Sequence, residues 1–245
     1  MKIKMIMVGA QGRMGQTILR LAKQNPDFEV AGEVDMGDNL ASVVNKADVV
    51  IDFSHHSATV DVAQTTAKAG KTLVIGTTGH SDAAKKAVLD CGKQIPLIFA
   101  SNYAVGVNIL FYLTRHVAEV IGDSFDQEII EMHHRMKKDA PSGTAKTLAE
   151  ILCEVQGRSY ADDVRHGRVG EPGERTKREI GMHALRGGDV AGDHTVIFAA
   201  DGERLELTYR ASSRDAFATG ALRAAKWLIG KPAGVYSMFD VLGLK

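Results

Sequence analysis

Short apolar runs alternate with amphipathic stretches over the first hundred residues. The runs are Ile3–Val8, Phe28–Val34, Val49–Phe53, Leu73–Ile75 and Ile95–Phe99. Between the first two, Met14, Ile18 and Leu21 recur at helical spacing. Nearly continuous apolar strands that alternate with helices are typical of a parallel sheet covered on both faces. The pattern predicts an α/β domain of the Rossmann type.

The pattern changes after the fifth apolar run. It predicts helices from near Val105, around 145–152 and at 217–228, and a strand at 124–132. Three further strands at 177–186, 190–200 and 204–212 are expected to form a meander, with Asp201-Gly202 as a two-residue hairpin turn. The polar stretch 157–178 is expected to be a long loop, functional or a flexible lid. We therefore expect a second domain of the α+β class.

Composition narrows the range of functions. Of 245 residues, 44% are hydrophobic, and 30 Lys and Arg balance 30 Asp and Glu. A net charge of zero argues against binding to nucleic acid or to an anionic membrane. The two cysteines, Cys91 and Cys153, form no CxxC motif, which excludes a disulfide framework and a cysteine-ligated zinc site. No apolar run approaches the roughly 20 residues of a membrane helix. A cytoplasmic protein is expected.

A glycine-rich string follows the first predicted strand and opens the first predicted helix. It reads Gly9-Ala10-Gln11-Gly12-Arg13-Met14-Gly15, and Asp35 comes twenty residues later at the end of the second strand. Glycines let the backbone approach a pyrophosphate at a helix N-terminus, and the acidic residue can accept hydrogen bonds from ribose hydroxyls. The alternatives are a tight turn without a ligand and a solvated loop aspartate. The context favours a dinucleotide site.

Two more loops follow predicted strands at the same sheet edge. Gly76-Thr77-Thr78-Gly79 follows the fourth strand, and Ala100-Ser101-Asn102-Tyr103 follows the fifth. Ligands of open α/β sheets bind beyond the carboxyl ends of the strands. These loops are candidates to line a nicotinamide, although as isolated tetrapeptides they would be ordinary turns.

The densest chemistry lies at 131–144, which reads EMHHRMKKDAPSGT. His133 and His134 do not have the spacing of a helical metal motif, and their cationic neighbours repel a divalent ion, so no metal is expected. Arg135 and Lys137 could instead bind an anion while the histidines transfer protons. Ser142 is a candidate N-cap, followed by Gly143 and Thr144 at a helix start that could take a carboxylate. The residues leave open a plain capped helix after a basic loop.

Several motifs together resemble 4-hydroxy-tetrahydrodipicolinate reductase, also called dihydrodipicolinate reductase. They are GAQGRMG, GTTG at 76–79, ASNYAVGVN at 100–108, RGGDVAGDHTVIF at 186–198, ASSRDAFATGAL at 211–222 and, most specifically, EMHHRMKKDAPSGTA at 131–145. The resemblance covers essentially the whole chain. It implies reduction of a cyclic dicarboxylic imine to tetrahydrodipicolinate with hydride from NADH or NADPH, in lysine and diaminopimelate biosynthesis.

The resemblance also implies roles for individual residues. His133 and Lys137 would be the catalytic acid–base pair, and the substrate would be bound by His134, Ser142, Gly143 and Thr144. The cofactor would contact Gly9, Ala10, Gln11, Gly12, Arg13, Met14, Asp35, Gly76, Thr77, Thr78, Ala100, Ser101, Asn102 and Tyr103. The dinucleotide-binding domain would comprise 1–103 and 214–245, and 104–213 would bind substrate and form a homotetramer through its open mixed sheet.

Two departures from the family pattern bear on the chemistry. Met136 stands where some members have histidine, so this position is not the expected proton donor. Met36 stands where some members have arginine, so both cofactors should work, with NADH equal or better.

Planar pyridine-2,6-dicarboxylate should compete with the dianionic substrate. A nicotinamide-sensing regulatory protein and another small imine or carbonyl acid reductase are the alternative functions.

Overall fold

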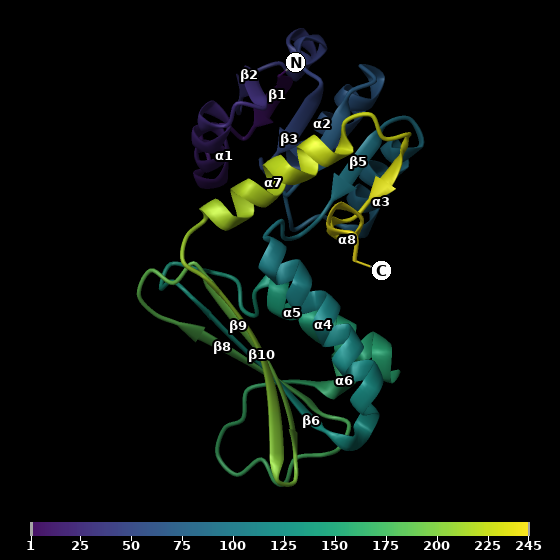
Figure 1. Cartoon of the computed structure of the whole chain (residues 1–245). Helices are drawn as coiled ribbons and strands as arrows, with labels where there is room; N and C mark the ends of the chain where they lie inside the picture. Colours follow the sequence, from purple (N-terminus) through teal and green to yellow (C-terminus); the bar gives the residue numbers. More distant parts are fainter. Residues whose placement is uncertain (1, 245) are drawn as a thin grey trace. The chain divides into compact units, whose positions relative to one another are not determined.

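The structure, a computed structural model, describes residues 2–244 and divides into two compact units. One unit comprises the residues up to Val105 together with those from Arg214 onward, and the other is Gly106–Ser213. Met1 and Lys245, which the sequence assigns to the dinucleotide-binding domain, lie outside the described residues. Figure 1 shows the helices and strands of both units.

The first unit is built on a parallel sheet, which confirms the predicted α/β, Rossmann-type class. Its strands are β1 (Ile3–Val8), β2 (Phe28–Val34), β3 (Val49–Asp52), β4 (Thr72–Ile75), β5 (Pro96–Phe99) and β11 (Gly234–Tyr236), in the order β11-β5-β4-β3-β1-β2. The five strands predicted in the first hundred residues differ from these by at most one residue at either end. The short β11 was not predicted.

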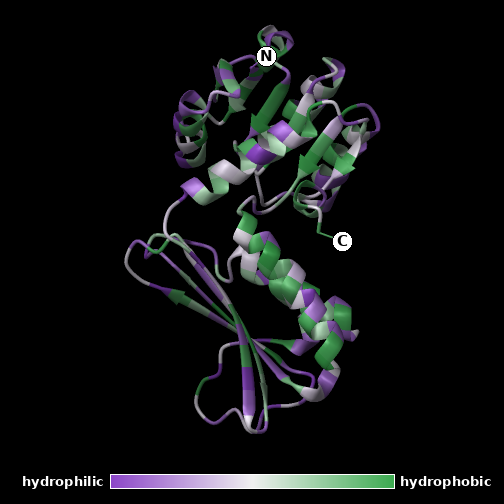
Figure 2. Cartoon of the chain, viewed as in Figure 1, coloured by the Kyte–Doolittle hydropathy of each residue, from purple (hydrophilic) through white to green (hydrophobic). Residues whose placement is uncertain are grey.

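Helices cover both faces of this sheet. One apolar core joins Met5 and Ile51 to α1 (Arg13–Gln24), α7 (Asp215–Leu228) and α8 (Met238–Leu242). The other joins Ile6 and Val50 to α2 (His56–Lys68) and α3 (Asp82–Asp90). Consecutive strand residues thus enter opposite cores, which explains the unbroken apolar runs visible in Figure 2. Two short 3₁₀ turns at 40–42 and 44–46 connect β2 to β3.

The second unit contains a mixed sheet, as predicted. Its strands are β6 (Asp126–His133), β7 (Val164–His166), β8 (Ile180–Arg186), β9 (Gly192–Ala200) and β10 (Glu203–Ala211), in the order β10-β9-β6-β8-β7. Its helices are α4 (Val105–Ile121), α5 (Gly143–Gln156) and α6 (Tyr160–Asp163). Helix α5 packs against β6, β8 and β9, and Arg115 of α4 pairs with Glu154 of α5 at 2.6 Å. The DG hairpin turn joins β9 to β10 as expected.

Two sequence expectations for this unit are wrong. The three later strands do not form a meander, because β6 lies between β8 and β9 and pairs parallel with the first and antiparallel with the second. Period-two patterns reveal a strand but not its neighbours. The stretch 157–178 is not entirely loop, since it includes α6 and β7. Both elements are too short to produce a periodic signal.

Strand β6 brings chemistry into the interior of the second unit. Its residues alternate, and Gln127, Ile129, Glu131 and His133 are buried while the intervening side chains are partly exposed. Among the described residues, Glu131 and His133 contact each other, whereas the side-chain amide of Gln127 has no hydrogen-bond partner. Across residues 2–244, no helix combines the length and apolar character needed to cross a membrane.

Candidate active site

The loop after β1 depends on backbone contacts that only glycine permits. Gly9 has φ +81°, and a Cβ there would lie 2.6 Å from the carbonyl oxygen of Phe53. A Cβ on Gly15 would lie 2.1 Å from the carbonyl oxygen of Gly9. Gly12 is the N-cap of α1, whose first backbone N–H groups lack partners within the helix. The string therefore forms a close-packed turn that ends at a helix N-terminus suited to an anion.

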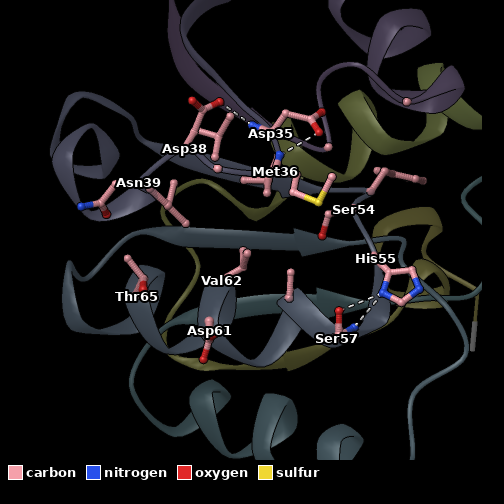
Figure 3. A pocket seen from close by; sticks show the side chains of 18 of the residues that line it. Asp35, Met36, Asp38, Asn39, Ser54, His55, Ser57, Asp61, Val62 and Thr65 are labelled. Atoms are coloured by element: carbon pink, nitrogen blue, oxygen red, sulfur yellow. Dashed lines mark hydrogen bonds between the residues drawn. The ribbon is translucent and has the colours of Figure 1, made fainter.

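Asp35 closes this turn from the end of β2. Its carboxylate accepts hydrogen bonds from the backbone N–H of Gln11 at 2.7 Å and of Met36 at 2.8 Å, and these bonds lower the pKa of the carboxyl. A cavity of about 860 Å³ lies beside it, with Gly9, Gly12 and Asp35 in its lining (Figure 3). Gly9, Gly12 and Asp35 therefore lie around one cavity, whereas the predicted cofactor contacts Ala10, Gln11, Arg13 and Met14 are not among its lining residues. Met36 also lines it, although 98% of its surface is exposed.

The order of strands explains the position of this cavity. Strand β1 has β2, the next strand in the chain, on one side and β3 on the other side. Such a switch point opens a crevice beyond the carboxyl ends of the strands. Phe53, Ser54 and His55, which follow β3, line the cavity and were not predicted. The end of the third apolar run would have indicated them by the same rule.

The loops after β4 and β5 each place one side chain in the interior, Thr77 in the first and Tyr103 in the second. Gly76 packs against the ring of Phe53, where an added Cβ would lie 2.2 Å away. The Tyr103 side chain is buried, and its hydroxyl donates to the carbonyl of Ile75 at 2.7 Å. Tyr103 thus contributes its side chain to the core. The other predicted members, Thr77, Thr78, Ala100, Ser101 and Asn102, follow the same two strands at this sheet edge.

In the second unit, His133 ends β6 with its ring held by a buried carboxylate. Its Nδ1 lies 2.6 Å from Oε2 of Glu131, two residues earlier on the same face. Glu131 also accepts two hydrogen bonds from Arg186, at 2.9 and 3.0 Å, and one from the backbone N–H of Ser142 at 3.1 Å. Sequence reasoning did not assign Glu131 or Arg186 to the site. The period-two alternation on β6 could have indicated Glu131.

A turn after β6 carries the predicted lysine. The backbone N–H of His134 donates to the carbonyl of Val190 at 2.8 Å, and that of Lys137 donates to the carbonyl of His134 at 3.0 Å. The Lys137 ammonium binds both carboxylate oxygens of Asp139 at 2.9 Å. Burial raises the pKa of Asp139, but Lys137 outweighs it and the pKa lies below its ordinary value. Asp139 therefore fixes the position of the Lys137 ammonium.

The predicted helix start follows directly. Ser142 caps α5, with its hydroxyl accepting from the backbone N–H of Ala145 at 3.3 Å. Helix α5 begins at Gly143, where an added Cβ would meet nothing within 4 Å, so the backbone is open to a ligand. Thr144 is buried beside it. The second unit thus brings His133, Lys137 and this helix start into one short segment of chain.

A second buried histidine adjoins His133. His194 on β9 lies opposite Glu131 in the sheet, and its ring centroid is 5.2 Å from that of His133. Burial, followed by the nearby His133, lowers the pKa of His194 to about 3, so it is neutral at physiological pH. Within residues 2–244, no group of three His, Cys, Asp or Glu side chains could hold a metal ion.

The parallel sheet of the first unit and its glycine turn are typical of dinucleotide-binding proteins, the class that includes NAD(P)-dependent oxidoreductases. The dihydrodipicolinate reductase N-terminus model matches residues 3–103, and the C-terminus model matches residues 106–242. The chain belongs to the dihydrodipicolinate reductase family. It is an NAD(P)H-dependent oxidoreductase of lysine and diaminopimelate biosynthesis, and the alternative of a regulatory sensor is not favoured.

Individual relatives and a solved structure are similar to this chain over nearly its whole length. A 4-hydroxy-tetrahydrodipicolinate reductase of Akkermansia muciniphila is 55% identical over 99% of this chain and 98% of its own length. One from Desulfotalea psychrophila is 44% identical over 99% and 98%. A dipicolinate-bound dihydrodipicolinate reductase from Paenisporosarcina sp. TG-14 covers 98% of this chain and 99% of its own. Its TM-score is 0.77 at 22% identity, which shows the shared fold.

Acid should weaken the second unit through the ion-paired carboxylates of Glu128 and Glu131. Burial raises the pKa of Glu128, but bonds from Arg168, His183 and Arg175 outweigh it and hold the pKa at about 2, and Glu131 behaves likewise. Because the folded pKa values are depressed, their stabilisation is complete above the ordinary value of 4.5 and is lost as pH falls toward 2.

We expect urea unfolding of the wild type to show a free energy of unfolding that declines steadily from pH 5 to pH 2. Glu128→Gln should have a flatter profile, because it removes one of the depressed carboxyls. Glu206→Gln, at an exposed site on β10, is the control and should keep the wild-type slope. Identical slopes for all three proteins would contradict the argument.

Proposed function

We propose that the chain reduces the cyclic dicarboxylic imine derived from 4-hydroxy-tetrahydrodipicolinate to tetrahydrodipicolinate, with NADH or NADPH as hydride donor. The observation that carries this proposal is the segment 133–144. It joins two proton-transfer groups, His133 and Lys137, to an open helix start at Gly143, inside a chain whose family membership is established. The helix start at Gly143 suits a carboxylate of a dianionic substrate, and His133 and Lys137 suit the proton that must follow the hydride.

The first unit fits a dinucleotide. Its cradle is one that a Cβ at Gly9 or Gly15 would fill, and it adjoins a cavity of about 860 Å³. Gly9, Ala10, Gln11, Gly12, Arg13 and Met14 would hold the pyrophosphate, Asp35 the ribose, and 76–78 with 100–103 the nicotinamide. A bound nicotinamide supplies the hydride. Tyr103 would contribute through its backbone, since its side chain is buried.

The second unit supplies substrate binding. The start of α5 at Ser142, Gly143 and Thr144 would take one carboxylate, because a helix N-terminus favours an anion. His134 would bind the substrate from the turn after β6. The dipicolinate bound to the solved relative supports a small dicarboxylate ligand.

Proton delivery falls to His133 and Lys137. Hydride addition to a conjugated imine leaves negative charge on the ring, and a positioned acid removes it, which contributes about 10²–10⁴-fold to the rate. The Lys137 ammonium is positioned by Asp139, and a substrate carboxylate can replace that partner. The exposed Met136 has no acid–base chemistry.

NADH should serve at least as well as NADPH. A 2′-phosphate brings about two negative charges toward the position of Asp35. Asp38 and Asp61 also line the cavity, so the local charge is acidic, and Met36 offers no compensating cation. Arg13 at the start of α1 is exposed and can reach a phosphate. Both cofactors should therefore be used.

The exposed sheet face, the net charge and the histidine spacing support proposals for the assembly, the location and the metal requirement of the enzyme. A homotetramer is supported by the open face of the second unit's sheet, where Ile130, Met132 and Ile197 are only partly covered and Leu185 is 48% exposed. The neutral charge and the sparse, free cysteines support a cytoplasmic enzyme that binds neither nucleic acid nor membrane. Metal-independent reduction is supported by the cationic, wrongly spaced histidine segment.

Replacing either proton donor should reduce turnover. We expect Lys137→Ala and His133→Ala each to lower kcat by at least about a hundredfold, the scale of a lost acid–base group. Binding of NADH, followed by fluorescence, should be unchanged because its residues lie in the other unit. Lys138→Ala, at the exposed neighbouring lysine, is the matched control and should retain kcat. Near-normal kcat in either first variant would remove that residue from the mechanism.

Pyridine-2,6-dicarboxylate should inhibit competitively against the imine substrate. We expect His134→Ala to raise its inhibition constant about tenfold or more, the effect of losing a charge-assisted hydrogen bond of roughly 1.5–3 kcal/mol. Initial-rate measurements at several substrate concentrations test this, with His116→Ala as a control outside the site. An inhibition constant that His134→Ala leaves unchanged would argue against the substrate position given above.

Cofactor choice should respond to charge beside Asp35. We expect kcat/KM for NADH to equal or exceed that for NADPH, and Met36→Arg to shift the ratio toward NADPH by about tenfold, which corresponds to about 1.4 kcal/mol. The shift should shrink at high salt because an exposed pair is screened. A wild-type enzyme with a tenfold preference for NADPH at moderate salt would contradict this and identify Arg13 as the phosphate ligand.

A further inference from the structure

Glu131 is a carboxylate without solvent contact. It lies in the middle of the second unit's sheet, and its exposed fraction is 0%. An unpaired charge in such a position would be strongly destabilising. Glu131 is instead surrounded by donors, from His133, from both terminal nitrogens of Arg186 and from the backbone of Ser142. It links the candidate acid, the helix start and a neighbouring strand through one side chain.

Arg186 keeps that carboxylate ionised and fixed. It lies opposite His133 in the parallel β6–β8 pairing and binds Glu131 through two nitrogens, a geometry that restricts both partners. It also donates to the carbonyl of Asp139 at 2.6 Å, beside the carboxylate that holds Lys137. Burial raises the pKa of Glu131, but the bonds from His133 and Arg186 outweigh it and hold the pKa at about 2.

The ionised carboxylate determines which nitrogen of His133 carries hydrogen. A carboxylate can only accept, so the contact of 2.6 Å requires a hydrogen on Nδ1. In the neutral ring, Nε2 is then the basic atom. The Nε2 atom lies over Gly192, where an added Cβ would be only 3.0 Å away. The neighbouring His194 is neutral and adds no competing charge.

We propose that Glu131, held by Arg186, is a positioning residue that fixes the Nδ1–H tautomer of His133 and so makes Nε2 the atom that donates and regains the catalytic proton. The charged ring carries hydrogen on both nitrogens. When Nε2–H passes its proton to the reduced substrate ring, Nδ1–H stays bonded to Glu131. The neutral ring keeps one orientation and recovers the proton at Nε2 from water. This inference rests on the proposed role of His133.

The test compares two carboxylates of the same strand, the buried Glu131 and the partly exposed Glu128. Glu131→Gln keeps shape but removes the charge. Because Arg186 would retain the amide oxygen, the amide NH₂ group would face His133 and favour hydrogen on Nε2. Glu128→Gln is the matched control, since Glu128 also binds a histidine, His183 at 2.8 Å, and an arginine pair. Glu128 lies on the opposite face of β6.

Two readouts separate positioning from folding. Nitrogen-15 NMR of the histidine rings, with His133 assigned by its loss in His133→Ala, reports the tautomer. Steady-state kinetics report kcat and KM. We expect Nδ1–H in the wild type and in Glu128→Gln, and Nε2–H in Glu131→Gln. We expect Glu131→Gln to lower kcat about ten- to a hundredfold with KM values within about threefold. Glu131→Asp, which keeps the charge, should recover part of the lost kcat.

The outcomes are distinguishable. A wild-type His133 with hydrogen on Nε2 would overturn the inference without any variant, which covers the case in which Glu131→Gln does not fold. A raised KM with unchanged kcat would also overturn it, because Glu131 would then only shape the substrate site. If His133→Ala lowers kcat but Glu131→Gln does not, the inference fails by itself. If neither lowers kcat, the proposed role of His133 fails and the inference with it.

Discussion

A charge without water must be matched by donors, and in the second unit this requirement organises the chemistry. The carboxylate of Glu131 accepts hydrogen bonds from His133 on its own strand, from Arg186 on β8 and from the backbone of Ser142, the N-cap of α5. Those donors are the groups that a proton-transfer site needs in fixed positions. The turn that carries Lys137 is closed by the same Arg186 that binds the carboxylate. Satisfying one buried group therefore also orders the segment 133–144.

The first unit solves a different problem with backbone atoms. Its glycine turn packs so closely against Phe53 and against itself that side chains are excluded, and the helix start is left facing the cavity. Parallel strands bring their ends to one edge, so residues far apart in sequence meet there without any long-range polar network. The two candidate anion sites thus depend on different features, the first on strand order and the second on a buried ion pair.

The sequence predicted most of the regular structure and much of the candidate site. Apolar runs predicted β1 to β5 of the first unit to within a residue at either end, because strands buried on both faces leave an unbroken signal. The neighbours of β8 could not be predicted, since alternation carries no information about pairing. The glycine string and Asp35 were found by their spacing. Glu131, Arg186 and His194 were not, because their importance depends on cross-strand contacts between residues up to 63 positions apart.

The first unit is discontinuous in sequence, and this has a consequence for synthesis on the ribosome. Helix α7 packs against α1, and β11 pairs with β5, so its sheet edge and one apolar core need the last segment of the chain. Domains fold as their residues emerge, from the N-terminus onward. The inserted second unit is therefore complete first, while the unit that begins earlier keeps one face of its nascent sheet uncovered. During that interval, we expect chaperones to bind the apolar sheet face that α7 and α8 later cover.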